Sequence, residues 1–148
     1  MEVTVKKRVL FLCTHNSARS QMAEGILRHL AGDRYESASA GSQPTSVHPL
    51  SVEVLAKRGV DISGQRAKDV RELLGEEFDL VVTLCGDDAP GSCPFFPGGR
   101  MHEHTSFPDP ASARGSEEEQ REAFRRVRDA LWAWIVDRFV EGGEGHEG

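Results

Sequence analysis

The chain has 148 residues, the length of one ordinary domain with its own hydrophobic core. The formal net charge of −6 argues against a general nucleic-acid binder and against a membrane-surface binder. The apolar runs are too short to span a bilayer, and residues 1–8 lack the pattern of a secretory signal, so we expect a cytoplasmic protein.

Hydrophobic periodicity predicts strands that alternate with helices. The apolar run at residues 9–12 predicts a buried strand over 6–13, and apolar residues at helical spacing predict a helix over 20–31. The further elements that we expect, in chain order, are a short strand over 35–40, a loop over 41–47, helices over 48–58 and 67–74, a strand over 78–84, a loop over 86–99, a strand over 100–106 and a long helix over 117–140. Residues 141–148 are rich in Gly and Glu and are expected to fray, so we place one domain at 1–140.

This alternation predicts an α/β fold with a mostly parallel sheet. Ligands of such sheets bind beyond the carboxyl ends of the strands. Three chemically notable features follow predicted strands, namely the loop that begins at Cys13, then Cys85, and then Asp109. We therefore expect these features to converge at one edge of the sheet.

The segment 13–20 is the most informative motif of the chain. Cys13 ends a predicted strand, and five residues separate it from Arg19 and Ser20, which begin a predicted helix. A loop at such a junction forms a nest of backbone N–H groups that binds a tetrahedral oxyanion, and the helix end favours a thiolate at its base. The residues that we expect to bind the oxyanion are Thr14, His15, Asn16, Ser17, Ala18, Arg19 and Ser20.

The same motif makes Cys13 a candidate nucleophile. Arg19 is placed to return over the loop and to contact the anion with two N–H groups. Ser20 is placed to donate a hydrogen bond to the sulfur, and Asn16 can bond across the loop and hold its strained turn. The alternative is a small buried cysteine that only ends a strand, but Arg-Ser at this spacing favours the nucleophile.

Asp109 is a candidate general acid. It lies between Pro108 and Pro110, which restrict the backbone and therefore the reach of the carboxylate. A general acid is needed where an oxygen of the substrate leaves as hydroxide or alkoxide. Asp-Pro is also a common turn former, and it is the Cys13 motif that makes Asp109 the leading candidate.

Cys85 and Cys93 flank a loop at residues 86–92 whose composition predicts mobility. The total of three cysteines is odd, which disfavours a purely structural disulfide set in a reducing compartment. A mobile loop would let the two sulfurs reach each other and exchange disulfides. Two alternatives stay open. Cys85 could simply end a buried strand, or zinc could be bound by Cys85, Cys93 and either His102 or His104, although the spacing fits no common zinc pattern.

Together these motifs resemble a known family, the thioredoxin-coupled arsenate reductases. Residues 13–25 (CTHNSARSQMAEG) resemble the family's N-terminal motif, and residues 81–85 (VVTLC) resemble its second-cysteine strand. Cys93-Pro94 resembles the third cysteine, and Asp109-Pro110 resembles the catalytic aspartate loop. The resemblance implies the fold of low-molecular-weight protein tyrosine phosphatases, which is a single-domain three-layer sandwich with a four-stranded parallel sheet and helices on both faces.

The resemblance also implies a mechanism. Cys13 attacks arsenate that is held by the loop and Arg19, and Asp109 protonates the departing oxygen. Cys85 then attacks Cys13, which releases arsenite, and Cys93 attacks Cys85, which leaves a Cys85–Cys93 disulfide for thioredoxin to reduce. The electrons come from thiols, so no metal and no organic cofactor is implied. Phosphate is expected as a competing anion, and we expect a monomer without nucleic-acid or membrane partners.

Some members of that family bind potassium near the active loop, with residues that match Asn16, Glu24 and Ser39 and with an aspartate that Lys68 replaces here. The resemblance therefore suggests that the Lys68 ammonium takes the place of the cation by pairing with Glu24. The alternative is that Glu24 and Lys68 are solvated surface charges. Three other histidines are expected on the surface, namely His29, His48 and His146.

Two other functions fit the same residues. A phosphatase would use the same nucleophile, arginine and acid through a phosphocysteine, and weak phosphatase activity would also fit a reductase. Phosphatases of this fold typically carry a tyrosine after the Asp-Pro pair, where this chain has Ala111, and they do not need the two later cysteines. A non-catalytic anion-binding or phosphopeptide-binding module is the third possibility, and it predicts that Cys13→Ser would retain function.

Overall fold

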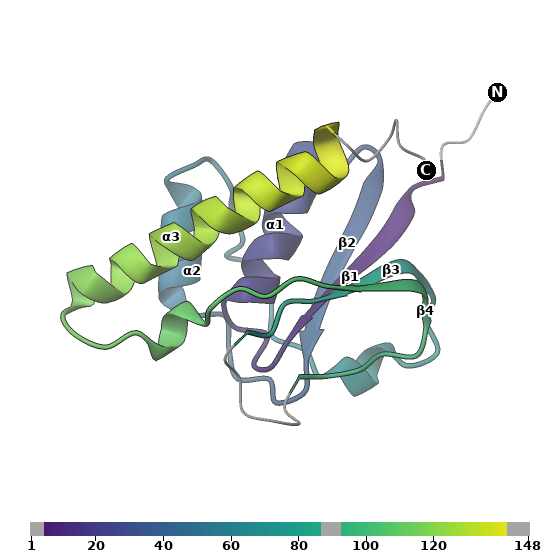
Figure 1. Cartoon of the computed structure of the whole chain (residues 1–148), viewed down its shortest axis with the longest axis horizontal. Helices are drawn as coiled ribbons and strands as arrows, with labels where there is room; N and C mark the ends of the chain where they lie inside the picture. Colours follow the sequence, from purple (N-terminus) through teal and green to yellow (C-terminus); the bar gives the residue numbers. More distant parts are fainter. Residues whose placement is uncertain (1–4, 87–92, 142–148) are drawn as a thin grey trace.

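A computed structural model describes residues 5–86 and 93–141. Its centre is a four-stranded sheet in the order β2-β1-β3-β4, in which the neighbouring strands are parallel. The strands are β1 (Lys7–Cys13), β2 (Tyr35–Gly41), β3 (Phe78–Thr83) and β4 (Gly99–His104). Figure 1 shows these strands at the centre of the molecule, with helices beside them. The predicted α/β fold with a parallel sheet is confirmed.

The described residues contain three α-helices, which are α1 (Arg19–Ala31), α2 (Pro49–Ala56) and α3 (Glu117–Ile135). A π-helical segment, η3 (Val136–Glu141), continues α3. The long helix begins at a capping box, in which the Ser116 hydroxyl accepts from the Glu119 N–H and the Glu119 carboxylate accepts from the Ser116 N–H. These helices agree with the predicted periodicity, and residues 142–148 of the predicted tail lie outside the described part.

The predicted helix over 67–74 is reduced to a single 3-10 turn, η1 (Val70–Leu73). Asp69 and Glu72 form a capping box that starts this turn. Gly75 follows shortly afterwards with φ of 98°, a left-handed conformation that ends helices. The space between these start and stop signals admits only one turn, and for that reason the prediction of a longer helix is wrong.

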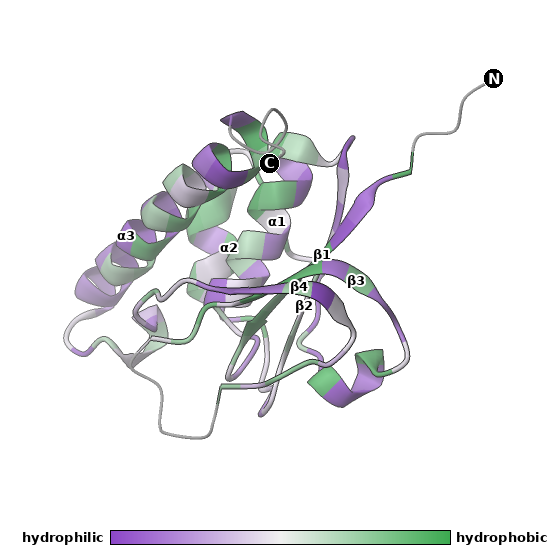
Figure 2. Cartoon of the chain, turned by 45° about the vertical axis from the view of Figure 1, so that its right-hand side comes forward, coloured by the Kyte–Doolittle hydropathy of each residue, from purple (hydrophilic) through white to green (hydrophobic). Residues whose placement is uncertain are grey.

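Two hydrophobic cores lie on opposite faces of the sheet. The larger core lies between the sheet and the three α-helices, and its members include Phe11, Met22, Ile26, Val54 and Leu131. On the other face, Leu10, Leu12 and Phe96 pack with Val70 and Leu73 of η1. Figure 2 shows all three α-helices on one side of the sheet and the short turn η1 on the other. The fold therefore has three layers: the α-helices, the sheet, and on the far face of the sheet the 3-10 turn η1.

The carboxyl ends of β1 and β3 leave the sheet side by side. In the register of these strands Leu12 lies opposite Thr83. Backbone hydrogen bonds continue the pairing beyond the strands, because Leu84 N–H donates to the Leu12 carbonyl at 2.9 Å and Phe107 N–H donates to the Leu84 carbonyl at 3.2 Å. The segments that carry Cys13, Cys85 and Asp109 therefore start from the same edge of the sheet.

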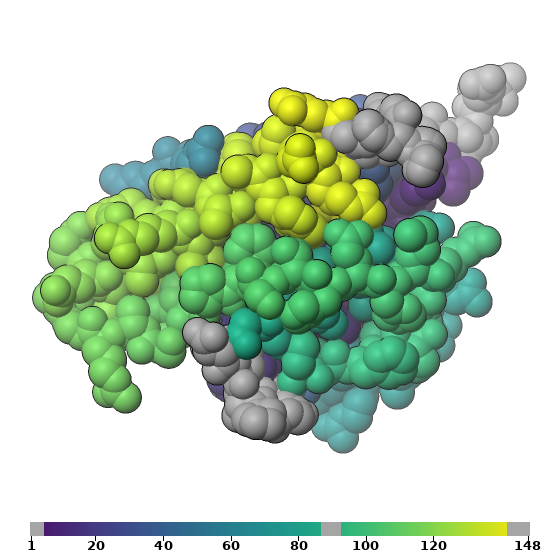
Figure 3. All heavy atoms as spheres, in the orientation of Figure 1, coloured from purple at the N-terminus to yellow at the C-terminus, as the bar shows by residue number. Residues whose placement is uncertain are grey.

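Helix α3 lies along the outside of the molecule, as the space-filling view in Figure 3 shows. At its carboxyl end, the ring of Phe11 from β1 makes edge contacts with Trp134 and Phe139. These contacts anchor the last helical segment to the central strand. Within residues 5–86 and 93–141, no helix is long and apolar enough to cross a membrane.

Candidate active site

The loop between β1 and α1 is held from the outside through its carbonyl groups. Backbone N–H groups of the segment 43–48 donate to three of these carbonyls at 2.8, 3.1 and 3.0 Å, namely to Thr14, His15 and Ser17 in that order. The Gln21 side chain donates to the carbonyl of Asn16 at 3.1 Å. In the described part of the chain, no acceptor is bonded to the backbone N–H groups of His15, Asn16, Ser17 and Ala18. A loop with bonded carbonyls and unbonded N–H groups is a nest for an anion.

This arrangement depends on two unusual backbone positions. Asn16 adopts φ of 49°, in the left-handed region that asparagine tolerates better than most residues. Gly41, which ends β2, touches the loop so closely that an added Cβ would lie 2.5 Å from the Thr14 carbonyl and 2.9 Å from the Asn16 nitrogen. A side chain at Gly41 would therefore displace the loop.

The side chain of Asn16 uses its whole hydrogen-bonding capacity. Its Nδ2 group donates to Ser20 Oγ at 2.8 Å and to Ser39 Oγ at 2.9 Å. Its Oδ1 atom accepts from Gln21 Nε2 at 2.9 Å and from the Lys68 backbone N–H at 2.8 Å. A backbone N–H only donates, so the contact with Lys68 fixes the orientation of the amide. These contacts agree with the expectation that Asn16 holds the strained turn.

Cys13 lies at the base of the loop and is only 2% exposed. Its sulfur is 2.8 Å from Ser20 Oγ. Since Ser20 Oγ already accepts a hydrogen bond from Asn16, its own proton can point to the sulfur. A hydroxyl donor of this kind stabilises a thiolate. Cys13 is also the one cysteine of the chain that is not in a disulfide.

Arg19 joins the anion loop to the loop of the candidate acid. Its Nη1 group donates to the Phe107 carbonyl at 3.2 Å, and its Nη2 atom lies 3.9 Å from Asp109 Oδ2. The other carboxylate oxygen of Asp109 accepts from the Ala111 N–H at 3.0 Å, as the N-cap of the 3-10 turn η2 (Pro110–Ser112). The sequence predicts contacts of Arg19 with the anion, whereas its contacts with the Asp109 loop emerge only from the structure.

Cys85 and Cys93 form a disulfide, with their Cα atoms 5.9 Å apart. Cys85 is buried, and its sulfur lies 4.0 Å from Thr14 Oγ1, next to the Cys13 loop. Cys93 is exposed. One sulfur of this disulfide therefore faces the anion loop while the other residue faces solvent. Residues 87–92, for which the composition predicts mobility, lie outside the described residues.

The alternative of a zinc site has no support in these positions. The two sulfurs are bonded to each other, and His102 Nε2 contacts the Phe96 carbonyl at 2.8 Å. Both ring nitrogens of His104 have hydroxyl partners, at 2.6 and 3.0 Å. Across residues 5–86 and 93–141, no group of three or more Cys, His, Asp and Glu side chains is arranged to hold a metal ion.

Glu24 is buried, so the alternative of a solvated surface charge does not hold for it. Its carboxylate accepts from Ser39 Oγ at 2.6 Å and lies 3.5 Å from Arg28 Nη1. The Lys68 ammonium donates to the Arg66 carbonyl at 3.2 Å. Burial lowers the pKa of Lys68, and the charge of Glu24 opposes that effect. The charges of Lys68 and Glu24 therefore interact. The described residues contain no direct ion pair between the two side chains, although the resemblance suggests one.

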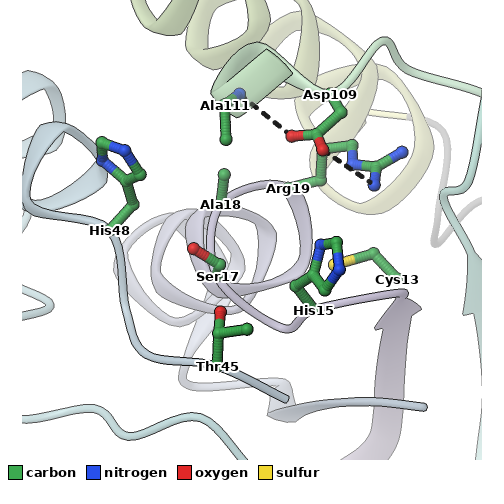
Figure 4. A pocket seen from close by; sticks show the side chains of 9 residues that line it. All are labelled: Cys13, His15, Ser17, Ala18, Arg19, Thr45, His48, Asp109 and Ala111. Carbon is green, nitrogen blue, oxygen red and sulfur yellow. Dashed lines mark hydrogen bonds and ion pairs between the residues drawn. The ribbon is translucent and has the colours of Figure 1, made fainter. Parts of the chain in front are cut away.

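A pocket of ≈ 190 Å³ opens above the sulfur, and its walls include residues that the sequence did not indicate. It is lined by Cys13, His15, Ser17, Ala18, Arg19, Thr45, His48, Asp109 and Ala111. Figure 4 shows Asp109 and Arg19 on one side and His48 on the other. Of the histidines expected on the surface, His29 is exposed, His48 is half-buried and lines the pocket, and His146 lies outside the described residues. One feature of the sequence could have indicated that Thr45 and His48 belong to the site. The segment 43–48 follows the carboxyl end of β2, and the carboxyl ends of all parallel strands lie at the same edge of the sheet.

The sequence is similar to proteins of known class. A profile of the family described as low molecular weight phosphotyrosine protein phosphatase matches residues 8–137. The arsenate reductase of Shouchella clausii (strain KSM-K16) is 45% identical over 139 residues, which cover 94% of this chain and 99% of that protein.

Solved structures agree. An arsenate reductase in its phosphate-binding state superimposes with a TM-score of 0.69 at 28% identity, over 88% of this chain and 95% of that one. The thioredoxin-dependent arsenate reductase of Corynebacterium glutamicum is 35% identical with a TM-score of 0.58, over 88% of this chain and 62% of that one. With a matching profile over most of its length and a closely similar relative, the chain belongs to the low molecular weight phosphotyrosine protein phosphatase family.

Proposed function

We propose that this protein reduces arsenate to arsenite through a relay of three cysteines, with Cys13 as the nucleophile. The observation that carries the proposal is the disulfide between Cys85 and Cys93, whose inner sulfur lies 4.0 Å from Thr14 in the anion loop. Hydrolysis of an ester at Cys13 needs no second thiol, whereas a reduction needs a source of two electrons at this place. The names of the similar arsenate reductases support the same substrate.

The first step is formation of a thiol–arsenate adduct. The reduced protein binds arsenate on the N–H groups of the loop and on Arg19, and the Cys13 thiolate attacks the arsenic. One As–O bond breaks, and the departing oxygen takes a proton from Asp109 and leaves as water. The Arg19 contact with the Phe107 carbonyl supports this role, because it couples the anion loop to the position of Asp109.

The second and third steps are thiol–disulfide exchanges. The Cys85 thiolate attacks the Cys13 sulfur, the S–As bond breaks, and its electron pair reduces arsenic so that arsenite leaves. The Cys93 thiolate then attacks the Cys85 sulfur and releases the Cys13 thiolate. The Cys85–Cys93 disulfide of the present structure corresponds to the state after this last exchange.

We propose thioredoxin as the protein that reduces this disulfide. Its dithiol would supply two electrons, and the exposed position of Cys93 offers a sulfur that a protein partner can attack. The name of the thioredoxin-dependent relative supports this partner. The chemistry requires a reducing compartment, for which we propose the cytoplasm. We further propose that phosphate competes with arsenate, since both are tetrahedral oxyanions, and that the protein acts as a monomer.

We propose that Lys68 serves as a resident cation beside the Glu24 network. The position that an aspartate would need for a potassium site carries Lys68, so the residues present do not fit that ion. The Lys68 backbone N–H donates to Asn16 Oδ1, and the charge of Glu24 stabilises the Lys68 ammonium. Lys68 therefore supplies a positive charge close to Asn16 and Glu24.

A phosphatase is the second candidate function, because the family profile describes phosphatases and Cys13, Arg19 and Asp109 would serve both chemistries. The pocket lining weighs against an aryl phosphate as the main substrate. Among the described residues that line it there is no Phe, Tyr or Trp, and Ala111 follows the Asp-Pro pair. Nothing in that lining would stack on a phosphotyrosine ring.

A coupled assay tests the proposal. With thioredoxin, thioredoxin reductase and NADPH, arsenate should drive NADPH oxidation by the wild-type protein, and Cys85→Ser or Cys93→Ser should abolish it. Hydrolysis of p-nitrophenyl phosphate by the same variants serves as the control for an intact Cys13 site. Absence of arsenate turnover in the wild type, together with ester hydrolysis that needs only Cys13, would make the protein a phosphatase.

A further inference from the structure

His48 is a fixed wall of the pocket. It is the N-cap of α2, where its Nδ1 atom accepts from the Leu50 N–H at 3.1 Å. Its ring packs on Phe124 with the centroids 4.6 Å apart. Its backbone N–H donates to the Ser17 carbonyl of the anion loop at 3.0 Å. The imidazole is therefore held by two contacts and its backbone by a third, and the side chain lines the same pocket as Cys13 and Asp109.

These contacts also determine where the imidazole carries its proton. Because Nδ1 accepts a hydrogen bond, the neutral ring has its proton on Nε2. Protonation of Nδ1 would destroy the helix cap. Burial lowers the pKa of His48, and the nearby charge of Asp109 only opposes this effect. His48 thus presents a neutral N–H donor at neutral pH, and within the described residues its Nε2 atom has no hydrogen-bond partner.

The pocket offers this donor a target. A tetrahedral anion above Cys13 has three oxygens that face the N–H groups of the loop, and its fourth oxygen points away from the sulfur. Besides the residues of the anion loop and Cys13, the pocket is lined by Thr45, His48, Asp109 and Ala111, so these are the residues that an oxygen pointing away from the loop can meet. The pocket of ≈ 190 Å³ is more than ten times the size of a cavity for one water molecule, which needs about 10–15 Å³ on the same measure, so a five-atom anion fits.

We propose that His48 is a specificity-determining residue, whose Nε2–H donates a hydrogen bond to the outward oxygen of the bound tetrahedral anion. An inorganic anion presents a good acceptor there. In a phosphate ester that oxygen carries an organic group, which makes it a weaker acceptor and fills the space in front of His48. The site would therefore favour inorganic arsenate or phosphate over esters. The proposal rests on the proposed function for its choice of arsenate, but its binding step is testable without turnover.

The test uses the protein in its Cys85–Cys93 disulfide form, in which Cys13 is the only thiol. Arsenate, and separately phosphate, should protect Cys13 from iodoacetamide. In His48→Asn the protecting concentration of both anions should rise by about 10- to 100-fold, the typical effect of one hydrogen bond to a charged group. Asparagine keeps the helix cap but loses the ring contact with Phe124, so the melting temperature should fall by no more than about 5 °C. The KM for p-nitrophenyl phosphate should rise by less than about threefold.

Two control variants separate this role from a structural one. His29→Asn changes an exposed histidine on α1, outside the pocket, and should leave the protecting concentrations unchanged. His48→Ala should weaken protection like His48→Asn, and it should also lower the melting temperature because the cap is lost.

The proposal is overturned if His48→Asn is protected like the wild type. It is also overturned if anions and ester weaken by the same factor, because His48 would then only support the loop. If protection changes as expected while the wild type shows no arsenate turnover, the proposed function fails and the role of His48 stands.

Discussion

Replacement of Asn16 by alanine should be among the most damaging single changes in this chain. Asn16 combines a left-handed backbone, with φ of 49°, and a side chain with four hydrogen bonds. Three of its partners are side chains, namely Ser20, Ser39 and Gln21, and Ser20 in turn contacts the Cys13 sulfur. The substitution removes all four bonds and places a residue with a Cβ, but no compensating polar group, in the left-handed region.

The expected magnitude follows from these contacts. A typical intramolecular hydrogen bond contributes about 1 kcal/mol, and a left-handed alanine costs about 1 kcal/mol. Four hydrogen bonds and the backbone strain together contribute about 5 kcal/mol to the difference in unfolding free energy. Water that enters the vacated space can bond to some of the former partners of Asn16, so we expect a loss of about 3–5 kcal/mol. For a domain of this size, that corresponds to a fall of about 10 °C in melting temperature.

Urea unfolding of the disulfide form measures this loss, with Asn16→Gly as the matched variant. Glycine also removes the side chain but tolerates positive φ, so Asn16→Gly should be more stable than Asn16→Ala by about 1 kcal/mol. The opposite order, or a loss below about 1 kcal/mol in Asn16→Ala, would refute the reasoning from strain and buried bonds.

Three further predictions address the surroundings of the site. Burial lowers the pKa of His48 below its ordinary value of 6.5, so the unfolded chain binds this proton more readily than the folded protein. The unfolding free energy should therefore fall as the pH drops through 6.5, and it should fall less steeply in His48→Asn. Equal slopes of the unfolding free energy against pH in the two proteins, measured by urea titration, would contradict this. Gly41→Ala should weaken arsenate protection of Cys13 at least tenfold, because its Cβ would lie 2.5 Å from the Thr14 carbonyl; wild-type protection would show that the loop adapts. Turnover should be equal in potassium and sodium chloride if Lys68 replaces the cation, and strong stimulation by potassium would exclude that role.

The sequence predicted the reactive residues of the site better than the residues that hold them in place. Cys13, Arg19 and Ser20 could be placed because a strand, a loop and a helix follow one another within a short stretch, and such local order is visible in periodicity and spacing. The sheet followed from the alternation of elements, and its parallel register then brought the Cys85 and Asp109 segments to the same edge.

Contacts between distant segments could not be predicted in this way. The role of the segment 43–48 depends on backbone bonds to the anion loop, which leave no mark on its composition. His48 looks like a surface residue next to a proline, and only the packing of α2 against Phe124 turns it into a wall of the pocket. Glu24 has the spacing of an exposed helical charge, yet Ser39 from β2 satisfies its carboxylate in the interior.

A single-turnover experiment on Cys93→Ser tests the relay most directly. The reduced variant is mixed with arsenate in the absence of thioredoxin, then quenched in acid, and its peptides are analysed by mass spectrometry. The relay predicts one arsenite per protein and a disulfide between Cys13 and Cys85, because the variant cannot pass the oxidation on. Release of arsenite without that disulfide, or no arsenite from a variant that still binds the anion, would contradict the three-cysteine mechanism.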